Sequence, residues 1–401
     1  MVTLADVQAA RGRIRDAVYL TPCARSEMLS RVSRCQAWLK LDHLQMTGAY
    51  KERGALNKLL TLGGPERARG LIAASAGNHA QAVAYHAGRL AVAATIVMPE
   101  TTPIMKVANT RGHGARVVLH GSNYDEAYAE ARRLEREEGM TFVHPFDDEV
   151  VIAGQGTVGL EVLEQVPELD AVVVPVGGGG LVSGIAAAVK ALAPSVRVVG
   201  VQTEALPCMQ AALENDEIVT LEAASTVADG IAVKRAGEIT FEHVRRLVDE
   251  IVTVSEEEIA SAILYLLEKE KSVVEGAGAV GVAAMMHHRL AGIEGKRICA
   301  VISGGNIDVN VIARVIERGL VKDGRLVRID IKLLDKPGQL AKVSTVISHH
   351  KANVIEVHHS RAFTERLGDT RLLLTLETRG PEHVEEILRA LRERGYQVDR
   401  V

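Results

Sequence analysis

Through residue 302 the chain alternates short apolar runs with longer amphipathic stretches, and this alternation restricts the folds that are open to it. The short runs are rich in Val, Ile and Ala, as strands buried on both faces are. The longer stretches carry apolar residues three and four positions apart, which is typical of helices that cover a sheet. The repeated order of strand, helix and strand predicts βαβ units and a mostly parallel sheet, so we expect a doubly wound α/β body.

The expected elements can be placed by number. We expect strands at 37–41, 71–74, 92–98, 115–119, 141–143, 171–176, 196–202 and 297–302. We expect helices at 81–90, 122–138, 156–166, 181–192 and 256–269. In such folds ligands bind at the carboxyl ends of the strands, so we expect the functional residues in the turns that follow the strands.

A second domain is expected after the polar connector Val-Lys-Asp-Gly-Arg at 321–325. The pattern there predicts strands and helices in the order βαββαβ, a ferredoxin-like arrangement. The strands are expected at 326–333, 353–360, 371–377 and 397–401, and the helices at 338–349 and 382–393. We expect Asp335 to cap the first of these helices. The expected domains are therefore 1–320 and 326–401, with a smaller lobe of the first at about 48–150.

The adjacent histidines of the C-terminal domain, His358 and His359, fall within an expected strand. Successive side chains of a strand point to opposite faces, so the pair is a poor metal site. We expect both to be surface residues, and nothing in this domain indicates catalysis.

Composition excludes several classes of partner. The net charge is −4 and only 3% of the 401 residues are aromatic, so we expect no nucleic acid partner. Asp6 and Arg11 place charges where a signal peptide is apolar, and no apolar run reaches the roughly 18 residues of a membrane span. The four cysteines show no C-x-x-C spacing, which argues against a zinc site. We expect a cytoplasmic protein without a membrane partner.

Lys51 lies in the segment Thr-Gly-Ala-Tyr-Lys-Glu-Arg-Gly-Ala, which follows an expected strand and opens a helix. The positive end of the helix dipole and partial desolvation both lower the pKa of a lysine there. A lysine with a lowered pKa is free to attack a carbonyl group. By itself this segment is equally consistent with a solvated surface lysine.

Four consecutive glycines, Gly177 to Gly180, separate an expected strand from a helix. Bare backbone amides at a helix N-terminus suit a phosphate group, whereas a simple tight turn needs only one or two glycines. The other glycine motif, at 276–281, matches G-x-G-x-x-G, but no proper strand precedes it, so we interpret it as a false match for NAD. No phosphate-binding P-loop and no G-x-S-x-G motif occur.

Two further junctions carry polar side chains: Ser-Ala-Gly-Asn-His at 75–79 and Ser-Gly-Gly-Asn at 303–306. Either is also consistent with plain helix capping, but the first offers amides and hydroxyls to a carboxylate. Together the junctions predict a pocket with a reactive amine, a phosphate site and a carboxylate site. The cofactor that carries both an aldehyde and a phosphate is pyridoxal phosphate.

Five motifs in this chain resemble those of the fold-type II pyridoxal-phosphate enzymes, whose fold is that of the tryptophan synthase β subunit. They lie at 47–55, 75–79, 177–180, 226–233 (Thr-Val-Ala-Asp-Gly-Ile-Ala-Val) and 303–306. Within that family they are similar to the motifs of the threonine and serine dehydratases. The C-terminal segment, with Asp-Lys-Pro-Gly-Gln-Leu at 335–340, resembles the ACT domain, a regulatory module that binds small effectors. The resemblance implies a catalytic domain of two doubly wound lobes followed by a ferredoxin-like ACT domain.

The resemblance also implies a role for each motif residue. Lys51 would bond to the cofactor aldehyde, Tyr50 would pack at the ring, Asn78 would bind the ring hydroxyl and Ser303 would face the pyridine nitrogen. Gly177, Gly178, Gly179, Gly180 and Leu181 would bind the phosphate. Ser75, Ala76, Gly77, Asn78 and His79 would bind the substrate carboxylate. A neutral serine at the pyridine nitrogen favours elimination of a β-hydroxyl over transamination, because it does not hold that nitrogen protonated.

The sequence departs from the family pattern at a few positions. Ala49 and Tyr50 stand where Ser-Phe is common, and Arg235 stands where proline often follows the Ala-Asp-Gly motif. Metal-binding relatives have an acidic pair after the strand that ends at Gln202; here Glu204 is present, but Gln210 occupies the second place. Glu204 is therefore a candidate ligand without a partner, and a monovalent cation bound by carbonyl groups stays open.

The leading hypothesis is conversion of L-threonine to 2-oxobutanoate and ammonia, with secondary activity on L-serine, as the first step toward isoleucine or in threonine catabolism. A serine racemase or serine dehydratase is the alternative within the family, and a catalytically silent amino-acid sensor is the alternative outside enzymes. A nicotinamide-dependent oxidoreductase is disfavoured by the missing fingerprint. The expected partners are an amino-acid substrate, a small effector at the ACT domain and further copies of the chain, as a tetramer or dimer.

Overall fold

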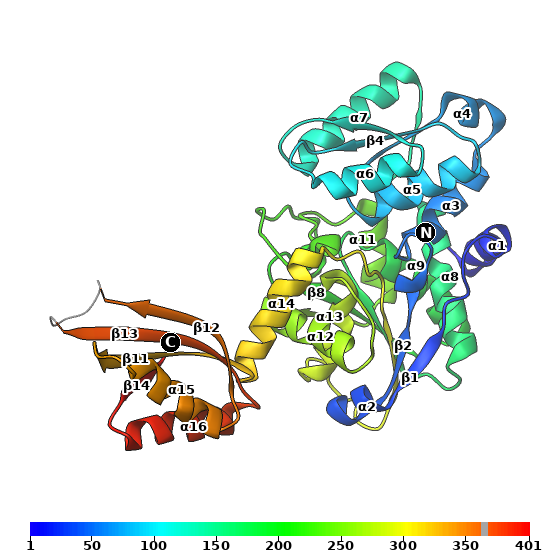
Figure 1. Cartoon of the computed structure of the whole chain (residues 1–401). Helices are drawn as coiled ribbons and strands as arrows, with labels where there is room; N and C mark the ends of the chain where they lie inside the picture. The colour runs from blue at the N-terminus through cyan, green and yellow to red at the C-terminus, as the bar shows by residue number, and fades with distance from the viewer. Residues whose placement is uncertain (362–367) are drawn as a thin grey trace. The chain divides into compact units, whose positions relative to one another are not determined.

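The structure is a computed structural model that describes residues 1–361 and 368–401. Contacts divide the chain into two compact units, Met1–Ile307 and Asp308–Val401. Helix α14 (Val309–Lys322) groups with the second unit and precedes the connector that the sequence singles out. Figure 1 shows the elements of each unit.

The larger sheet of the first unit has the strand order β1-β2-β10-β7-β8-β9. Its neighbours pair in parallel, except that β1 runs antiparallel to β2. The strands are β1 (Cys23–Ser26), β2 (Gln36–Lys40), β7 (Ala171–Pro175), β8 (Arg197–Thr203), β9 (Glu250–Val254) and β10 (Arg297–Val301). All five residues of β7 are buried, as expected for a central strand covered on both faces.

The smaller sheet of this unit is entirely parallel, with the order β5-β4-β3-β6. Its strands are β3 (Leu71–Ala74), β4 (Ala94–Met98), β5 (Arg116–Leu119) and β6 (Thr141–Phe142). With it lie α3 (Lys51–Thr61), α4 (Gly64–Arg69), α5 (Asn78–Arg89), α6 (Ile104–Gly112) and α7 (Tyr124–Glu138), which together form the separate small lobe seen in Figure 1. The remaining helices of the first unit are α1 (Leu4–Ile14), α2 (Glu27–Ser33), α8 (Glu149–Gln165), α9 (Gly180–Leu192), α10 (Cys208–Asn215), α11 (Glu238–Leu247), α12 (Glu256–Glu268) and α13 (Gly276–Met286), with short 3-10 turns η1 (Asp42–Leu44) and η2 (Asp229–Ile231).

Helix α8 begins at Glu149, seven residues before the expected start at 156. The glycines within α8 do not delay the start of the helix; they let it pack closely against its neighbours. A Cβ at Gly154 would lie 2.6 Å from the carbonyl oxygen of Arg53, and one at Gly156 would lie 2.7 Å from that of Gly184. Glycine therefore lets α8 pack directly on α3 and α9, although its helix propensity is low.

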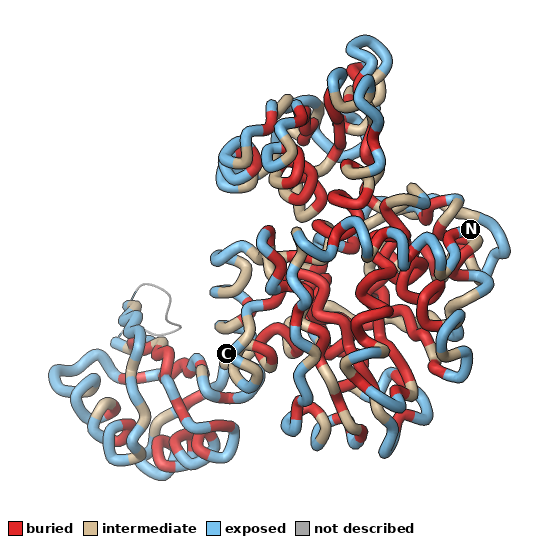
Figure 2. Tube along the Cα trace, turned by 90° about the vertical axis from the view of Figure 1, so that its right-hand side faces the viewer, coloured by how far each residue is buried: buried red, intermediate tan, exposed pale blue. Residues whose placement is uncertain are grey.

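A buried charge network fixes the position of α3 within the first unit. Arg53 donates to Asp42 at 2.8 Å and to Glu161 at 2.6 Å, and Lys40 donates to Glu161 at 2.6 Å. All four side chains are at most 7% exposed, and their charges balance. In Figure 2 the buried segments of this unit, drawn in red, gather in its interior. Because Arg53 is two residues after Lys51, the network holds the start of α3 in place.

In its described residues, 308–361 and 368–401, the second unit contains an antiparallel sheet of order β12-β13-β11-β14 and the helices α15 and α16 besides α14. Its elements are β11 (Leu326–Leu334), α15 (Gln339–His349), β12 (Asn353–Ser360), β13 (Asp369–Glu377), α16 (Pro381–Glu393) and β14 (Gln397–Arg400). The ferredoxin-like order βαββαβ is confirmed. His358 and His359 are both exposed, as predicted.

One detail of this unit was predicted wrongly. Asp335 does not cap α15: the capping position is Gly338, at φ +84°, with no side-chain hydrogen bond. The carboxylate of Asp335 instead pairs with Arg361 at 2.8 Å. Asp335 lies four residues before the first helical residue, and Pro337 and Gly338 turn the chain between them, so its side chain is too far from the first helical amides.

The sequence pattern missed two strands at opposite edges of the larger sheet, β1 and β9. Two of the four residues of β1 are exposed, and its sequence Cys-Ala-Arg-Ser has no apolar run. β9 reads Glu-Ile-Val-Thr-Val, an apolar run that the sequence analysis overlooked. Among residues 1–361 and 368–401, no helix combines the length and apolar character needed to cross a bilayer.

Candidate active site

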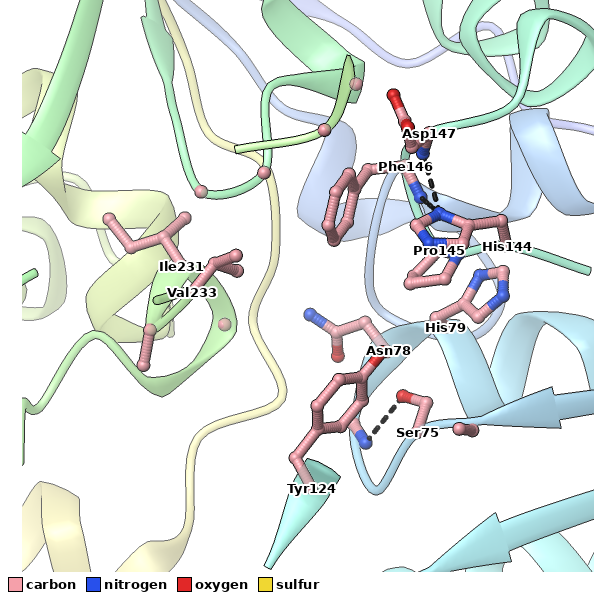
Figure 3. Close-up of a pocket in the computed structure, with 18 of the residues that line it drawn as sticks. Ser75, Asn78, His79, Tyr124, His144, Pro145, Phe146, Asp147, Ile231 and Val233 are labelled. Atoms are coloured by element: carbon pink, nitrogen blue, oxygen red, sulfur yellow. Dashed lines mark hydrogen bonds between the residues drawn. The ribbon is translucent and has the colours of Figure 1, made fainter. Parts of the chain in front are cut away.

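A cavity of about 1260 Å³ opens between the two lobes of the first unit. It is lined by the turns that follow β3, β7 and β10 and by the start of α3 (Figure 3). The predicted cofactor and substrate residues that line it are Tyr50, Lys51, Ser75, Ala76, Gly77, Asn78, His79, Gly177, Gly178, Gly179, Gly180, Leu181 and Ser303. The structure therefore brings every predicted site residue except Glu204 to one cavity.

Lys51 is the first residue of α3, and its Nζ donates to the carbonyl oxygen of Pro145 at 2.6 Å. Nζ also lies 5.2 Å from the centre of the Tyr50 ring. Burial lowers the pKa of Lys51 to about 8, partly opposed by the nearby carboxyl group of Glu275. About a tenth of this amine is therefore uncharged at pH 7, far more than for an ordinary lysine.

The four-glycine turn leads from β7 into α9, and Gly179 has the left-handed backbone angle φ +98°. A Cβ at Gly179 would lie 2.7 Å from Met209, and one at Gly180 would lie 2.9 Å from the Cβ of Phe146. The hydroxyl of Thr240 donates to the carbonyl oxygen of Gly178 at 2.6 Å and holds the turn. Bare backbone at the start of α9 is an anion site that needs no cationic side chain.

Asn78 is fixed by two partners that the sequence analysis did not assign to the site. Its Nδ2 donates to Glu275 at 2.7 Å, and its Oδ1 accepts from Nδ2 of Asn306 at 2.7 Å. Asn306 also donates to the carbonyl oxygen of Thr47 at 2.7 Å. One amide hydrogen of Asn78 is left to donate into the cavity.

Glu275 is 4% exposed and lies at the capping position of α13. Burial raises the pKa of Glu275 to about 7, and Asp229 adds to the shift. Sequence reasoning missed this residue because it directly precedes the glycine motif at 276–281, which was set aside as a false NAD match. A single carboxylate before a long uncharged helix was the available signal.

The turn at 75–79 passes from β3 into α5, so amides of the first helical turn point toward the cavity. The amide of Gly77 donates to Oγ of Ser75 at 3.2 Å. His79 is 3% exposed, and its Nε2 bonds the carbonyl oxygen of Val143 at 2.8 Å, so Nε2 carries the proton. Burial lowers the pKa of His79 to about 3, which keeps the ring neutral.

Ser303 lies two residues after the end of β10 and is 3% exposed. Its carbonyl oxygen accepts from the amide of Tyr50 at 3.0 Å, which joins this turn to the start of α3. Glu204 is half-exposed, lies 3.6 Å from Arg289 and is not part of the cavity lining. Among the described residues, no group of three His, Cys, Asp or Glu side chains is placed to hold a metal ion.

The sequence model of the family of pyridoxal-phosphate dependent enzymes matches residues 14–304 of this chain. The chain belongs to this family. The model of the ACT domain matches residues 323–395, which confirms the predicted fold class, a fold-type II catalytic domain followed by an ACT domain. Helix α14 lies between the two matches.

The chain is also similar to individual members of the family. An L-threonine ammonia-lyase of Thermotoga maritima is 50% identical over 99% of both chains. The structure of a processed threonine deaminase isoform of Solanum lycopersicum has a TM-score of 0.75 and 37% identity, covering 78% of this chain and 91% of that one. The structure of maize serine racemase also has a TM-score of 0.75, with 32% identity, covering 80% of this chain and 98% of that one.

The cavity fits pyridoxal phosphate, the cofactor of the family, on three observations. The amine of Lys51 has a lowered pKa and suits the aldehyde. The glycine turn at the start of α9 presents bare backbone to the cavity, and a Cβ there would collide with Phe146, Met209 or Thr240. Asn78 has one amide hydrogen left for the ring hydroxyl. The three groups come from three different elements, and all line one cavity.

Proposed function

We propose that this chain is a pyridoxal-phosphate-dependent threonine ammonia-lyase, which converts L-threonine to 2-oxobutanoate and ammonia and acts more slowly on L-serine. The observation that carries the proposal is Lys51, a buried amine with a lowered pKa, in one cavity with the glycine turn and the turn at 75–79. The similarity to the Thermotoga maritima enzyme supports the choice of substrate. Threonine and serine differ by one methyl group, which is worth only about 1–3 kcal/mol of discrimination.

In this proposal each group of the cavity has one task. Lys51 anchors the cofactor, the glycine turn with Leu181 binds its phosphate, and Asn78 and Ser303 hold the two polar edges of its ring. Bound pyridoxal phosphate supplies the electron withdrawal that makes the Cα proton of an amino acid acidic. Tyr50 covers the ring, and Glu275 with Asn306 positions Asn78.

Proton handling falls to Lys51. When it is not bonded to the cofactor, Nζ would take the Cα proton of the substrate as a general base. The lowered pKa of the free amine makes it easier to deprotonate near neutral pH, and in the cofactor-free chain the carbonyl group of Pro145 accepts a hydrogen bond from Nζ. The β-hydroxyl would leave as water with the proton that Nζ returns to it, and the released enamine, 2-aminocrotonate, would hydrolyse with a second water to 2-oxobutanoate and ammonia.

A serine racemase is the second candidate, supported by the similarity to the maize enzyme and by the presence of Ser75 in the cavity. A racemase needs a second acid–base group on the opposite face of Cα, and Ser75 is the candidate. The products distinguish the two activities, because elimination releases ammonia whereas racemisation leaves the amino group on the amino acid.

The family match at 323–395 supports a regulatory role for the second unit. We propose that it binds a small effector, with isoleucine, valine and adenine nucleotides as the compounds to test first. We further propose a cytoplasmic homo-oligomer, a tetramer ahead of a dimer, in the first step toward isoleucine or in threonine catabolism. A monovalent cation held by carbonyl groups is to be tested by exchanging potassium for sodium.

The deciding experiment incubates the purified full-length chain, loaded with pyridoxal phosphate, with L-threonine and with L-serine. We expect 2-oxobutanoate and ammonia in equal amounts from threonine, a slower reaction with serine, and a near-visible absorption band in the resting enzyme. D-serine without ammonia would replace the proposal by the racemase. An absorption band with neither product would overturn both.

A further inference from the structure

His144 has no role in the function proposed above, yet it lines the same cavity. It follows β6, and β6 pairs in parallel with β3 in the register Ile72 to Phe142. Two residues further on, His144 is level with Ala74 at the carboxyl edge of the sheet. It therefore lies beside the turn at 75–79, which begins at that edge (Figure 3).

The hydrogen bonds of His144 fix its tautomer. Its Nδ1 accepts from the amide of Asp147 at 2.7 Å and from that of Phe146 at 3.3 Å. Since backbone amides only donate, Nδ1 carries no proton, and the proton of the neutral ring is on Nε2. Burial lowers the pKa of His144 to about 4, so the ring is neutral at pH 7. The ring of Phe146 packs edge-on against it, with the centres 4.7 Å apart, and limits its rotation.

The two histidines at this edge differ in what they offer to a ligand. The Nε2 hydrogen of His79 is used by the carbonyl oxygen of Val143, and its Nδ1 is buried and carries no proton, so His79 has no hydrogen left to donate. Nε2 of His144 has no protein partner in the described part of the chain, so its hydrogen is left for a ligand. Of the pair, His144 alone can donate to a carboxylate.

We propose that His144 is a further substrate-binding residue, which donates its Nε2 hydrogen to the carboxylate of the amino-acid substrate. The proposal rests on the proposed function, since it takes the substrate to be an amino acid bound at the turn at 75–79. His144 acts here as a neutral donor, because burial and the nearby charge of Lys51 both lower the pKa of its ring.

A matched pair of variants separates this role from a structural one. In His144→Asn, the side-chain oxygen can take the place of Nδ1 and keep the bonds from the amides of Phe146 and Asp147, but the Nε2 donor is lost. In His144→Gln, the amide nitrogen can take the place of Nε2 and keep a donor, but the acceptor at Nδ1 is lost. A structural role makes His144→Gln the more damaged variant, whereas a substrate contact makes it His144→Asn.

The readout is binding of two unreactive ligands to the full-length holoenzyme, measured by isothermal titration calorimetry. L-2-aminobutyrate has the carboxylate but no leaving group, and L-2-aminobutanamide replaces the carboxylate by an uncharged amide. A hydrogen bond to a charged group is worth more than one to a neutral group. We expect His144→Asn to bind the acid roughly 10-fold or more weakly and the amide within about threefold of wild type, and His144→Gln to keep the wild-type ratio of the two affinities.

A wild-type ratio in His144→Asn, or an equal loss for both ligands, overturns the proposal. The proposed function is tested separately by ammonia release from threonine in the wild-type enzyme. If ammonia is released normally and the ratio does not change, only the role of His144 fails. If the ratio changes and no ammonia is released, His144 binds a carboxylate in an enzyme with another reaction.

Discussion

The two units of the chain place their polar groups differently. The first unit buries charged and amide side chains around one cavity, among them Lys51, Glu275 and Asn78. In the described part of the second unit the helix-covered face of the sheet is apolar, and the buried His383 bonds only backbone groups: it accepts from the amide of Arg379 and bonds the carbonyl oxygen of His350. Burying a polar group has a cost that only a function or a hydrogen bond offsets, so the comparison places the chemistry in the first unit.

Replacing Lys51 tests this contrast most severely. Lys51→Ala removes both the anchoring amine and the proposed base, so we expect kcat to fall by about 10³-fold or more. Lys51→Arg is the matched control, since it keeps a positive charge without a nucleophilic amine, and it should fail equally. Release of 2-oxobutanoate and the absorption band are the two measurements. Normal turnover in either variant would remove Lys51 from the mechanism.

The glycine turn is the next strongest test. Gly179→Ala places a Cβ at φ +98° and 2.7 Å from Met209. The left-handed backbone costs about 1–2 kcal/mol and the crowding about 1–3 kcal/mol more. We expect weaker binding of pyridoxal phosphate and a lower melting temperature.

Gly292→Ala is the control for that variant, because Gly292 has φ +68° with no atom within 4 Å of an added Cβ. It should show the backbone cost alone and leave the affinity for the cofactor unchanged. Equal cofactor affinities in the two variants would mean that the turn at 177–180 does not bind the phosphate.

Glu275 allows a finer test of the buried polar groups. Glu275→Ala leaves the amide of Asn78 without its partner, which costs about 1–3 kcal/mol. Glu275→Gln keeps an acceptor oxygen for Asn78 and should retain most of the cofactor affinity. The affinity for pyridoxal phosphate, titrated by absorption, separates the two. If both variants lose affinity alike, the charge of Glu275 matters rather than the position of Asn78.

The lowered pKa of Lys51 predicts a pH dependence for the loading of cofactor into the cofactor-free chain. Only the uncharged amine attacks the aldehyde, and burial lowers the pKa from 10.5 to about 8. The loading rate should therefore rise about tenfold per pH unit below pH 8 and level off above it. Stopped-flow absorption measures this rate. A rate that still rises at pH 10 would show an ordinary, solvated lysine.

The site was largely predictable from the sequence because its parts follow strands. In a parallel sheet the carboxyl ends of the strands share one edge, so the turns at 177–180 and 303–306, which follow the neighbouring strands β7 and β10, had to meet. The turn at 75–79 follows β3 of the smaller sheet, and the sheet-edge rule alone does not place it at the same cavity. Glu275 and His144 were missed for different reasons. Glu275 precedes a helix without a strand before it. His144 directly follows the expected strand at 141–143, but the segment His-Pro-Phe-Asp after that strand has no glycine run or Ser-Asn motif to mark it as a ligand-binding turn.

Replacing the exposed histidines of the second unit should have the smallest effect on stability and turnover. This variant is therefore the counterpart to the buried polar groups of the first unit. His358 and His359 lie on β12, an edge strand, and both are exposed. Replacing both by alanine removes no buried contact, so we expect a change in unfolding free energy within about 0.5 kcal/mol and an unchanged kcat. Leu374→Ala, in the apolar core of the same sheet, is the contrast and should cost about 2–5 kcal/mol. Thermal unfolding with threonine turnover on the same samples measures both. A large loss of turnover in the histidine variant, with normal stability, would show that polar groups at the surface of the second unit also act on the reaction, and the division of chemistry by burial would then fail.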